Sequence, residues 1–418
     1  MASKNLNFWF DFSCPYAYLA STRVEALAER TGATLEAKPV LLGGIFQAVG
    51  TNQRLFATLA PAKMEHNAKD LQRHADLWET PLRFPENHPL RTVTALRALL
   101  VAGKPYMPLA HKFYKAYWDD NLDIGDPEIV GRILEEHGLD ADAILKKTQD
   151  QDIKDELRHR TDEAIEAGLF GVPGFQVGDE VYWGQDRMHF VESALGGNPD
   201  TIQSIAEYPE QEIHPVDFYF DYSSPFSYIA AMRAPRLLGP HLRWKPMLLG
   251  GVFNSIGTAN VPLFEASAAK QRYLQKDCIR QASEARAVFH WPAHFPMNTV
   301  LPLRMTLIAL REDKIRAQNF ILATYQAYWA SNKNISDPAV MAEVADSAGF
   351  DGQSLLQGTQ DQSIKDALRH STDDAVATGV FGAPTFVVRS GNGDPSIYWG
   401  NDRLALVIRA AMGDQKVL

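Results

Sequence analysis

An internal repeat sets the main constraint on how this chain folds. Residues 8–18 read Phe-Trp-Phe-Asp-Phe-Ser-Cys-Pro-Tyr-Ala-Tyr, and residues 218–228 read Phe-Tyr-Phe-Asp-Tyr-Ser-Ser-Pro-Phe-Ser-Tyr. Further matches follow in the same order, at 41–46 and 248–253, 148–175 and 359–386, and 182–187 and 398–403. A unit of about 200 residues is too long for a solenoid repeat and long enough for its own core. The sequence therefore predicts a duplicated domain.

Composition places the boundary between the two copies. Residues 196–215 are polar, contain Gly-Gly-Asn-Pro, and lack helical or strand periodicity, which is typical of a linker. We expect a first copy over residues 1–198, a linker over 199–214, and a second copy over 215–418.

The same order of elements is expected in each copy. In the first, residues 8–12 and 35–40 read as strands around a helix at 16–31, and residues 53–168 are rich in helical patterns. A hairpin at 175–183 and a closing helix follow. A βαβ unit, a helical insertion and a ββα unit form the thioredoxin-type layout. We therefore predict an α/β fold with two thioredoxin-like domains, each with a helical insertion of the DsbA type.

Overall composition narrows the functional classes. The chain has 418 residues, 45% of them hydrophobic, and a formal net charge of −10, which argues against a nucleic-acid partner. Residues 1–7 do not resemble a secretory signal, and no apolar run is long enough to span a bilayer. Two cysteines in non-equivalent places indicate a reducing, cytoplasmic setting, and Cys/His spacing of the metal-binding kind is absent. We expect no metal.

The first candidate site is the Cys14-Pro15 step and its counterpart Ser224-Pro225. Proline at the start of a helix is ordinary, so either pair can be a simple helix cap. A helix N-terminus also stabilises a thiolate through its unpaired N–H groups and its dipole. A cysteine here is expected to ionise readily, whereas a serine can donate a hydrogen bond to another molecule's thiolate. We predict that Cys14 and Ser224 are catalytic.

A second candidate is a proline that leads into a strand. Phe-Gly-Val172-Pro173 and Phe-Gly-Ala383-Pro384 each precede a predicted strand. A structural turn is one interpretation. The other is a cis-proline facing the helix N-terminus, which leaves the backbone of Val172 or Ala383 free to pair with a bound peptide.

A third candidate is the helix start in Trp-Gly-Gln185-Asp186 and Trp-Gly-Asn401-Asp402. Helix capping alone is enough to explain an aspartate at this position. The same amides and N–H groups can instead hold a small carboxylate-bearing ligand, with the aspartate on its ammonium group.

Weaker candidates occupy matching positions elsewhere. Lys63 and Lys270 are equivalent residues for which solvent exposure is the simplest reading, and Asn260 follows a double-glycine segment as a turn former. Cys278 is expected to be a buried core residue.

Taken together, these motifs resemble the 2-hydroxychromene-2-carboxylate isomerase and kappa-class glutathione transferase group of the DsbA-like thioredoxin superfamily. The resemblance covers nearly the whole chain, once per half. It implies glutathione as cofactor or cosubstrate. It assigns glutathione contacts to Ser224 for the sulfur, Ala383 or Val172 beside Pro384 or Pro173 for the tripeptide backbone, Asn401 and Asp402 (Gln185 and Asp186) for the γ-glutamyl end, and Lys270, with Lys63 and Asn260 as further candidates.

The second copy keeps the family pattern more closely. It has Ser224, Asn298, Thr385 and Asn401, where the first copy has Cys14, Arg91, Gly174 and Gln185. The resemblance implies a glutathione-dependent isomerase or transferase acting on an aromatic-derived small molecule, mainly in the second copy. Two alternatives stay open: a monothiol disulfide or glutathione exchange at Cys14, and a glutathione-binding module without catalysis. We expect no nucleic-acid or membrane partner, and the two copies are candidates for an internal pseudo-dimer and the whole chain for a further homodimer.

Overall fold

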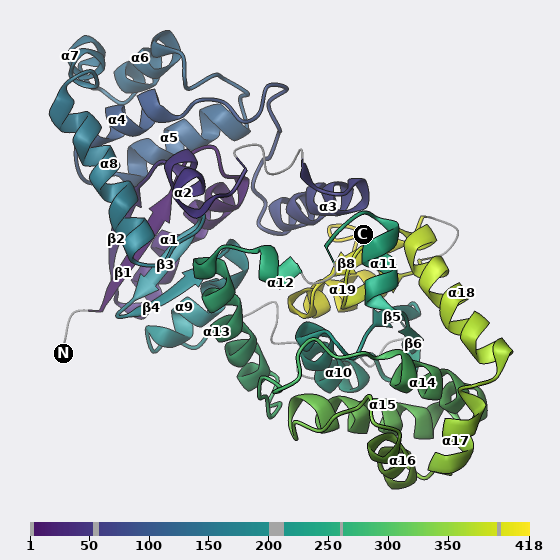
Figure 1. Ribbon diagram of the computed structural model, residues 1–418. Coiled ribbons are helices and arrows are strands. Elements are labelled where there is room, and N and C mark those ends of the chain that lie inside the picture. The colour runs from purple at the N-terminus through teal and green to yellow at the C-terminus, as the bar shows by residue number, and fades with distance from the viewer. Residues whose placement is uncertain (1–3, 53–57, 200–212, 260–261, 391–393) are drawn as a thin grey trace. The chain divides into compact units, whose positions relative to one another are not determined.

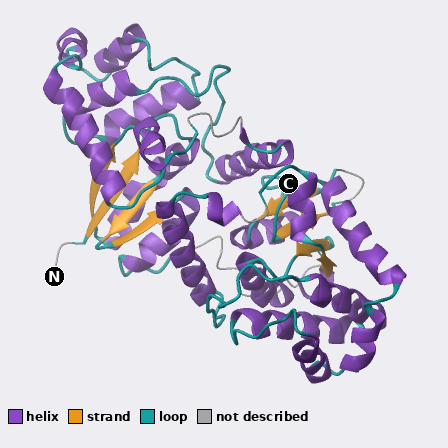
Figure 2. Cartoon of the chain, in the orientation of Figure 1, coloured by secondary structure: helices purple, strands orange, loops and turns teal. Residues whose placement is uncertain are grey.

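The computed structural model describes residues 4–52, 58–199, 213–259, 262–390 and 394–418, so most of the expected linker lies outside the described residues. Each copy contains one four-stranded sheet surrounded by helices (Figure 2). The first copy consists of β1 (Asn5–Phe10), α1 (Pro15–Thr31), β2 (Thr34–Pro39), α2 (Leu42–Val49), α3 (Pro61–Leu77), α4 (Val93–Ala102), α5 (Met107–Trp118), α6 (Pro127–Glu136), α7 (Ala141–Lys147), α8 (Gln151–Glu166), β3 (Gly174–Val177), β4 (Glu180–Trp183), the 3₁₀ helix Gln185–Arg187 and α9 (Met188–Ala194).

The second copy repeats this order. It consists of β5 (Val216–Phe220), α10 (Pro225–Leu238), the 3₁₀ helix Gly239–His241, β6 (Leu242–Pro246), α11 (Leu249–Ser255), α12 (Pro262–Glu265), α13 (Ala268–Glu284), α14 (Val300–Glu312), α15 (Lys314–Trp329), α16 (Pro338–Ser347), α17 (Gly352–Gly358), α18 (Gln362–Thr378), β7 (Thr385–Val388), β8 (Ser396–Trp399), the 3₁₀ helix Asn401–Arg403 and α19 (Leu404–Ala411).

Both sheets have the same topology. The strand order is β2-β1-β3-β4 in the first copy and β6-β5-β7-β8 in the second. The first strand of each copy runs parallel to the second and antiparallel to the third, which forms a hairpin with the fourth. This arrangement confirms the predicted thioredoxin-like fold with a helical insertion.

Local sequence explains where the first helix of each copy begins. Cys14 and Ser224 have extended backbones, and a proline follows at the first helical position, where its missing N–H costs nothing. The first strand ends earlier than predicted, at Phe10 rather than Phe12, because Asp11 and Phe12 belong to the loop that leads to the helix.

The helical insertion holds that loop in place. In Figure 1, α4 to α8 gather at one end of the β1–β4 sheet. On α5, the Tyr114 hydroxyl donates to the Asp11 carbonyl at 3.3 Å, and the Trp118 indole donates to the Phe12 carbonyl at 2.8 Å. Tyr325 and Trp329 on α15 make the matching bonds, at 3.2 and 2.9 Å. The insertion therefore positions the start of the first helix in both copies.

The compact units of the chain differ slightly from the two sequence copies. The first unit comprises most of residues 1–201 together with Ser267–Lys270, and the second comprises most of 202–418 together with Ala60–Ala68. Each unit thus includes one short segment from the other copy.

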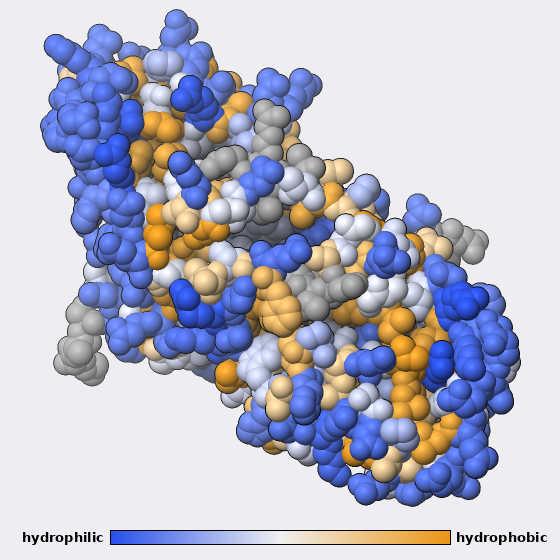
Figure 3. Space-filling model, in the orientation of Figure 1, coloured by the Kyte–Doolittle hydropathy of each residue, from blue (hydrophilic) through white to orange (hydrophobic). Residues whose placement is uncertain are grey.

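The described ranges lack both a membrane-spanning helix and a cluster of metal-binding side chains. None of their helices is long and apolar enough to cross a membrane. The same ranges hold no group of three or more His, Cys, Asp or Glu residues that could bind a metal ion. The outer surface over α6, α7 and α8 is mainly hydrophilic (Figure 3).

Candidate functional site

A buried aspartate anchors the site loop of each copy. Asp221 accepts hydrogen bonds from the Ser223 N–H at 2.9 Å, the Leu249 N–H at 2.8 Å and the Thr299 hydroxyl at 2.7 Å. Asp11 likewise accepts from the N–H groups of Ser13 and Leu42. Burial raises the pKa of both carboxyl groups, and these hydrogen bonds oppose that rise. Sequence reasoning missed this role, although the aspartate is present in both copies of the motif.

Cys14 lies at the N-terminus of α1, as predicted, but the structure contradicts its expected ready ionisation. Its side chain is only 6% exposed, and Sγ donates to the Val172 carbonyl oxygen at 3.1 Å. Burial, with a smaller effect of Asp11, raises the pKa of the Cys14 thiol to about 12, while the N–H groups of Ala17 and Tyr16 lower it less. The helix-end donors are present, but the loss of hydration outweighs them.

Ser224 occupies the equivalent position at the start of α10. Its hydroxyl donates to the Ala383 carbonyl oxygen at 2.9 Å and accepts from the Ser227 N–H at 3.1 Å. The second bond makes Ser224 a side-chain helix cap, which is the simpler of the two interpretations. The hydroxyl nevertheless faces the same carbonyl position as the thiol of Cys14, so the two copies present a hydroxyl and a thiol at one geometric site.

The predicted cis-prolines are confirmed. The Val172-Pro173 and Ala383-Pro384 peptide bonds are both cis. The carbonyl groups of Val172 and Ala383 face the helix N-termini, where they accept the bonds from Cys14 and Ser224. Their N–H groups have no acceptor among the described residues. Because buried N–H groups are nearly always paired, these two are candidates to bind a peptide-like ligand.

A tryptophan packs beside each of these segments. A Cβ added at Gly382 would meet Nε1 of Trp399 at 2.6 Å, and one added at Gly171 would meet Nε1 of Trp183 at 3.0 Å. Phe381 contacts the Trp399 ring at a centroid distance of 5.2 Å. The glycine before each cis bond is therefore required by the close approach of an indole ring.

The amide side chains next in the chain are less accessible than the sequence suggested. Asn401 is 2% exposed and donates through Nδ2 to Oε1 of Gln281 at 2.7 Å. Gln185 is also buried; its Oε1 accepts from Arg23 at 2.5 Å, and its Nε2 has no partner among the described residues.

The neighbouring aspartates lie inside the short 3₁₀ helices and do not cap α9 and α19. Neither 3₁₀ helix has a side-chain cap, and Asp186 and Asp402 each lie 3.2 Å from the adjacent arginine. Their side chains are 19% and 17% exposed, so these carboxylates remain partly accessible while the amides do not.

Lys63 and Lys270 each belong to the compact unit that is formed mainly by the other copy. Lys63 belongs to the second compact unit, where Nζ lies 4.9 Å from the Trp399 ring centroid. Lys270 belongs to the first unit and lies 5.6 Å from the Trp183 ring centroid, and burial lowers its pKa. The interpretation of solvent-exposed lysines is wrong for Lys270, because its ammonium is desolvated.

His66 also belongs to the second unit and was not singled out from the sequence. Its Nε2 accepts from the Trp399 N–H at 3.0 Å, and its ring packs against Phe381. The copies differ at this position, which carries Tyr273 in the second, so the repeat gave no signal. Asn260 lies outside the described residues, and Cys278 is buried, as expected.

One family model matches both copies, and the known relatives each cover about half of this chain. A model of the DsbA-like thioredoxin domain matches residues 5–196 and 215–410. The 2-hydroxychromene-2-carboxylate isomerase of Sphingobium xenophagum is 31% identical, with 46% of this chain and 98% of that protein covered. The glutathione S-transferase kappa 2 of Caenorhabditis elegans is 27% identical, covering 46% and 89%. A solved 2-hydroxychromene-2-carboxylate isomerase structure matches at 29% identity, covering 46% and 94%, with a TM-score of 0.42.

Proposed function

This chain belongs to the DsbA-like thioredoxin family, in the group of 2-hydroxychromene-2-carboxylate isomerases and kappa-class glutathione transferases, and we propose that it is a glutathione-dependent isomerase of an aromatic-derived small molecule. The observation that carries the proposal is the hydrogen bond from the Ser224 hydroxyl to the Ala383 carbonyl oxygen, in a residue whose own N–H is unpaired within the described ranges. A hydroxyl at a helix N-terminus lies next to a half-buried N–H group that has no acceptor among the described residues.

These residues fit a tripeptide thiol. The N–H and carbonyl of Ala383 present a short backbone edge, which is how extended peptides are commonly bound. Ser224 lies next to that edge and has a hydroxyl that can donate to a sulfur anion. Asp402 supplies a partly accessible carboxylate for an ammonium group. Bound glutathione would supply a thiol whose anion is a strong nucleophile.

Each residue has a separate task in this proposal. Ser224 exchanges its bond to the Ala383 carbonyl for a bond to sulfur, and the N-terminus of α10 adds a favourable electrostatic field. Asp221 keeps the loop before Ser224 fixed against α11. Asn401 acts indirectly, since its buried amide is bonded to Gln281 and does not face solvent.

The second copy is the better candidate for this activity. In the first copy, Cys14 holds a protonated thiol in the place of the hydroxyl, and its raised pKa disfavours an exchange reaction in which it is the attacking thiolate. The monothiol alternative therefore has no structural observation in its favour. We propose that catalysis depends on Ser224 and not on Cys14.

Matched substitutions in the two copies test this division. Isomerisation of 2-hydroxychromene-2-carboxylate is measured with glutathione for the wild type, Ser224→Ala and Cys14→Ser, together with glutathione affinity by calorimetry. Loss of a hydrogen bond to a charged acceptor should lower the kcat/KM of Ser224→Ala by about tenfold to a hundredfold. Cys14→Ser should stay within about twofold, because it only exchanges the thiol for a hydroxyl.

Two results would overturn the proposal. One is an unchanged kcat/KM for a folded Ser224→Ala variant. The other is a wild-type protein that shows no binding of glutathione. A loss of activity confined to Cys14→Ser would instead move the chemistry to the first copy.

A further inference from the structure

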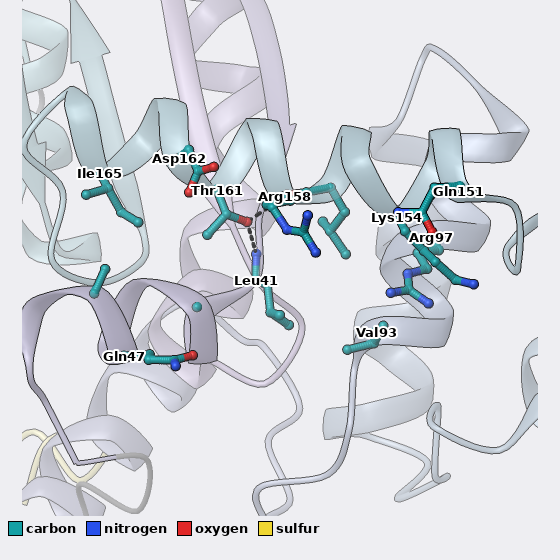
Figure 4. A pocket seen from close by; sticks show the side chains of 13 residues that line it. Leu41, Gln47, Val93, Arg97, Gln151, Lys154, Arg158, Thr161, Asp162 and Ile165 are labelled. Atoms are coloured by element: carbon teal, nitrogen blue, oxygen red, sulfur yellow. Dashed lines mark hydrogen bonds between the residues drawn. The ribbon is translucent and has the colours of Figure 1, made fainter.

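The first copy contains a pocket that is not lined by the start of α1 or by the cis-proline segment. It has a volume of about 670 Å³, is open to solvent on one side, and lies between α2, α4 and α8 (Figure 4). Neither Cys14 nor Val172 lines it. Pockets for small organic ligands typically measure about 300–1,000 Å³, so this one has the size of a ligand site.

Positive charge is concentrated in this pocket. Lys154 and Arg158 lie on one face of α8, four residues apart, and Arg97 approaches from α4 (Figure 4). Asp162 is the one carboxylate among its lining residues, so three cations and one anion leave a net charge of +2. An anion is therefore the favoured occupant.

Arg97 and Arg158 make no strong contact with other side chains of the described residues, whereas Nζ of Lys154 donates to the Gln149 carbonyl oxygen. The Nε atom of Arg97 is buried and has no hydrogen-bond partner among the described residues, and burial lowers the pKa of its guanidinium. Arg158 reaches Asp155 at 3.4 Å, but its side chain is 71% exposed. Exposed pairs of this kind contribute little to stability. Since a buried donor without an acceptor is unfavourable, Arg97 marks the place where an anion would be stabilised.

The duplication gives an independent observation. At the equivalent positions the second copy has Arg304, Lys365 and Arg369, and Nε of Arg304 is likewise buried without a partner among the described residues. Thr161 is also repeated, but its role is structural, because its hydroxyl accepts from the Leu41 N–H at 3.0 Å. Among the described residues no such bond is made by Nε of Arg97 or of Arg304, whereas Lys154 already donates to the Gln149 carbonyl oxygen.

We propose that the pocket between α2, α4 and α8 is a binding site for a small organic carboxylate. Arg97, Lys154 and Arg158 bind the carboxylate group, and Leu41, Val93 and Ile165 contact the hydrocarbon part. Arginine suits this task because its planar guanidinium matches a carboxylate and stays charged when partly buried. The site needs neither glutathione nor Ser224, and so it is separate from the function proposed above.

Direct binding to the full-length protein tests the site. Benzoate and inorganic phosphate are titrated by calorimetry without glutathione. The Arg304→Gln background is used throughout, so that the second copy does not contribute. We expect benzoate to bind more tightly than phosphate, and Arg97→Gln to weaken benzoate binding about tenfold or more. Arg132→Gln is the matched control, since Arg132 is exposed on α6 and does not line the pocket.

Each outcome of these titrations either supports or overturns the proposed carboxylate site. Benzoate affinity that stays within about twofold in both Arg97→Gln and Arg158→Gln would overturn the proposal. Phosphate binding as tight as benzoate binding would also overturn it, by indicating an inorganic anion site. If Arg97→Gln fails to fold, Arg158→Gln decides the question, because that exposed side chain can be changed without disturbing the core. Ser224→Ala should leave benzoate affinity unchanged, whatever its effect on isomerisation.

Discussion

The ionisation of Cys14 can be predicted quantitatively. Its pKa rises from 9.0 to about 12, chiefly through burial. At pH 8, a thiol of pKa 9 is about one-tenth ionised, whereas a thiol of pKa 12 is ionised about once in ten thousand molecules. Because only the thiolate attacks alkylating agents, folded Cys14 should react about a thousand times more slowly than an exposed cysteine.

The assay is the rate of iodoacetamide modification between pH 7 and 10, followed by mass spectrometry. A Cys278→Ala variant leaves Cys14 as the one cysteine in the sequence. The same variant unfolded in guanidinium serves as the control and should react at the ordinary rate. A rapid reaction of the folded protein with an apparent pKa below 8 would refute the reasoning. It would mean that the N–H groups of Tyr16 and Ala17 outweigh burial.

The same shift affects stability. Because the folded pKa of Cys14 lies above the unfolded value, folding favours the protonated thiol. That contribution is complete below about pH 9 and is lost as the pH rises towards 12. Cys14→Ser should therefore lose less stability over this alkaline range than the wild type does.

Two further substitutions test the packing around the site. Gly382→Ala should lower the melting temperature more than Gly171→Ala, because the added Cβ would lie 2.6 Å from Nε1 of Trp399, against 3.0 Å from Nε1 of Trp183 for Gly171→Ala. The expected cost of Gly382→Ala is about 1–3 kcal/mol. Equal melting temperatures of the two variants would contradict this prediction. Thr372→Val removes the acceptor of the Leu248 N–H and should cost about 1–3 kcal/mol in denaturant unfolding, while an unchanged midpoint would show that water replaces the hydroxyl.

Much of the fold followed from local signals. The strand-helix-strand opening and the hairpin near Gly178 were predicted because alternation and turn residues act over a few neighbouring residues. The cis bonds at Pro173 and Pro384 were predicted for the same reason. The predicted ends of the strands were less accurate, because Asp11 and Phe12 leave the sheet and accept hydrogen bonds from α5.

The candidate site was predicted only in outline. The proximity of Ser224 and Ala383 was predicted correctly, because the thioredoxin layout determines which helix end lies next to which strand end. The sequence did not show that the Asn401 amide is hydrogen-bonded to Gln281. Nor did it show that Lys63 and His66 lie beside Trp399. These partners lie more than a hundred residues away along the chain.

The amino-acid sequence by itself determined that one domain occurs twice, with a hydroxyl in one copy where the other has a thiol. These properties are encoded in residue order and in short-range backbone constraints. Only the tertiary structure decided that the thiol is buried and stays protonated, and that cations from α4 and α8 line one pocket. Desolvation and charge clustering depend on residues that folding brings together, and the repeat pattern carries no measure of either.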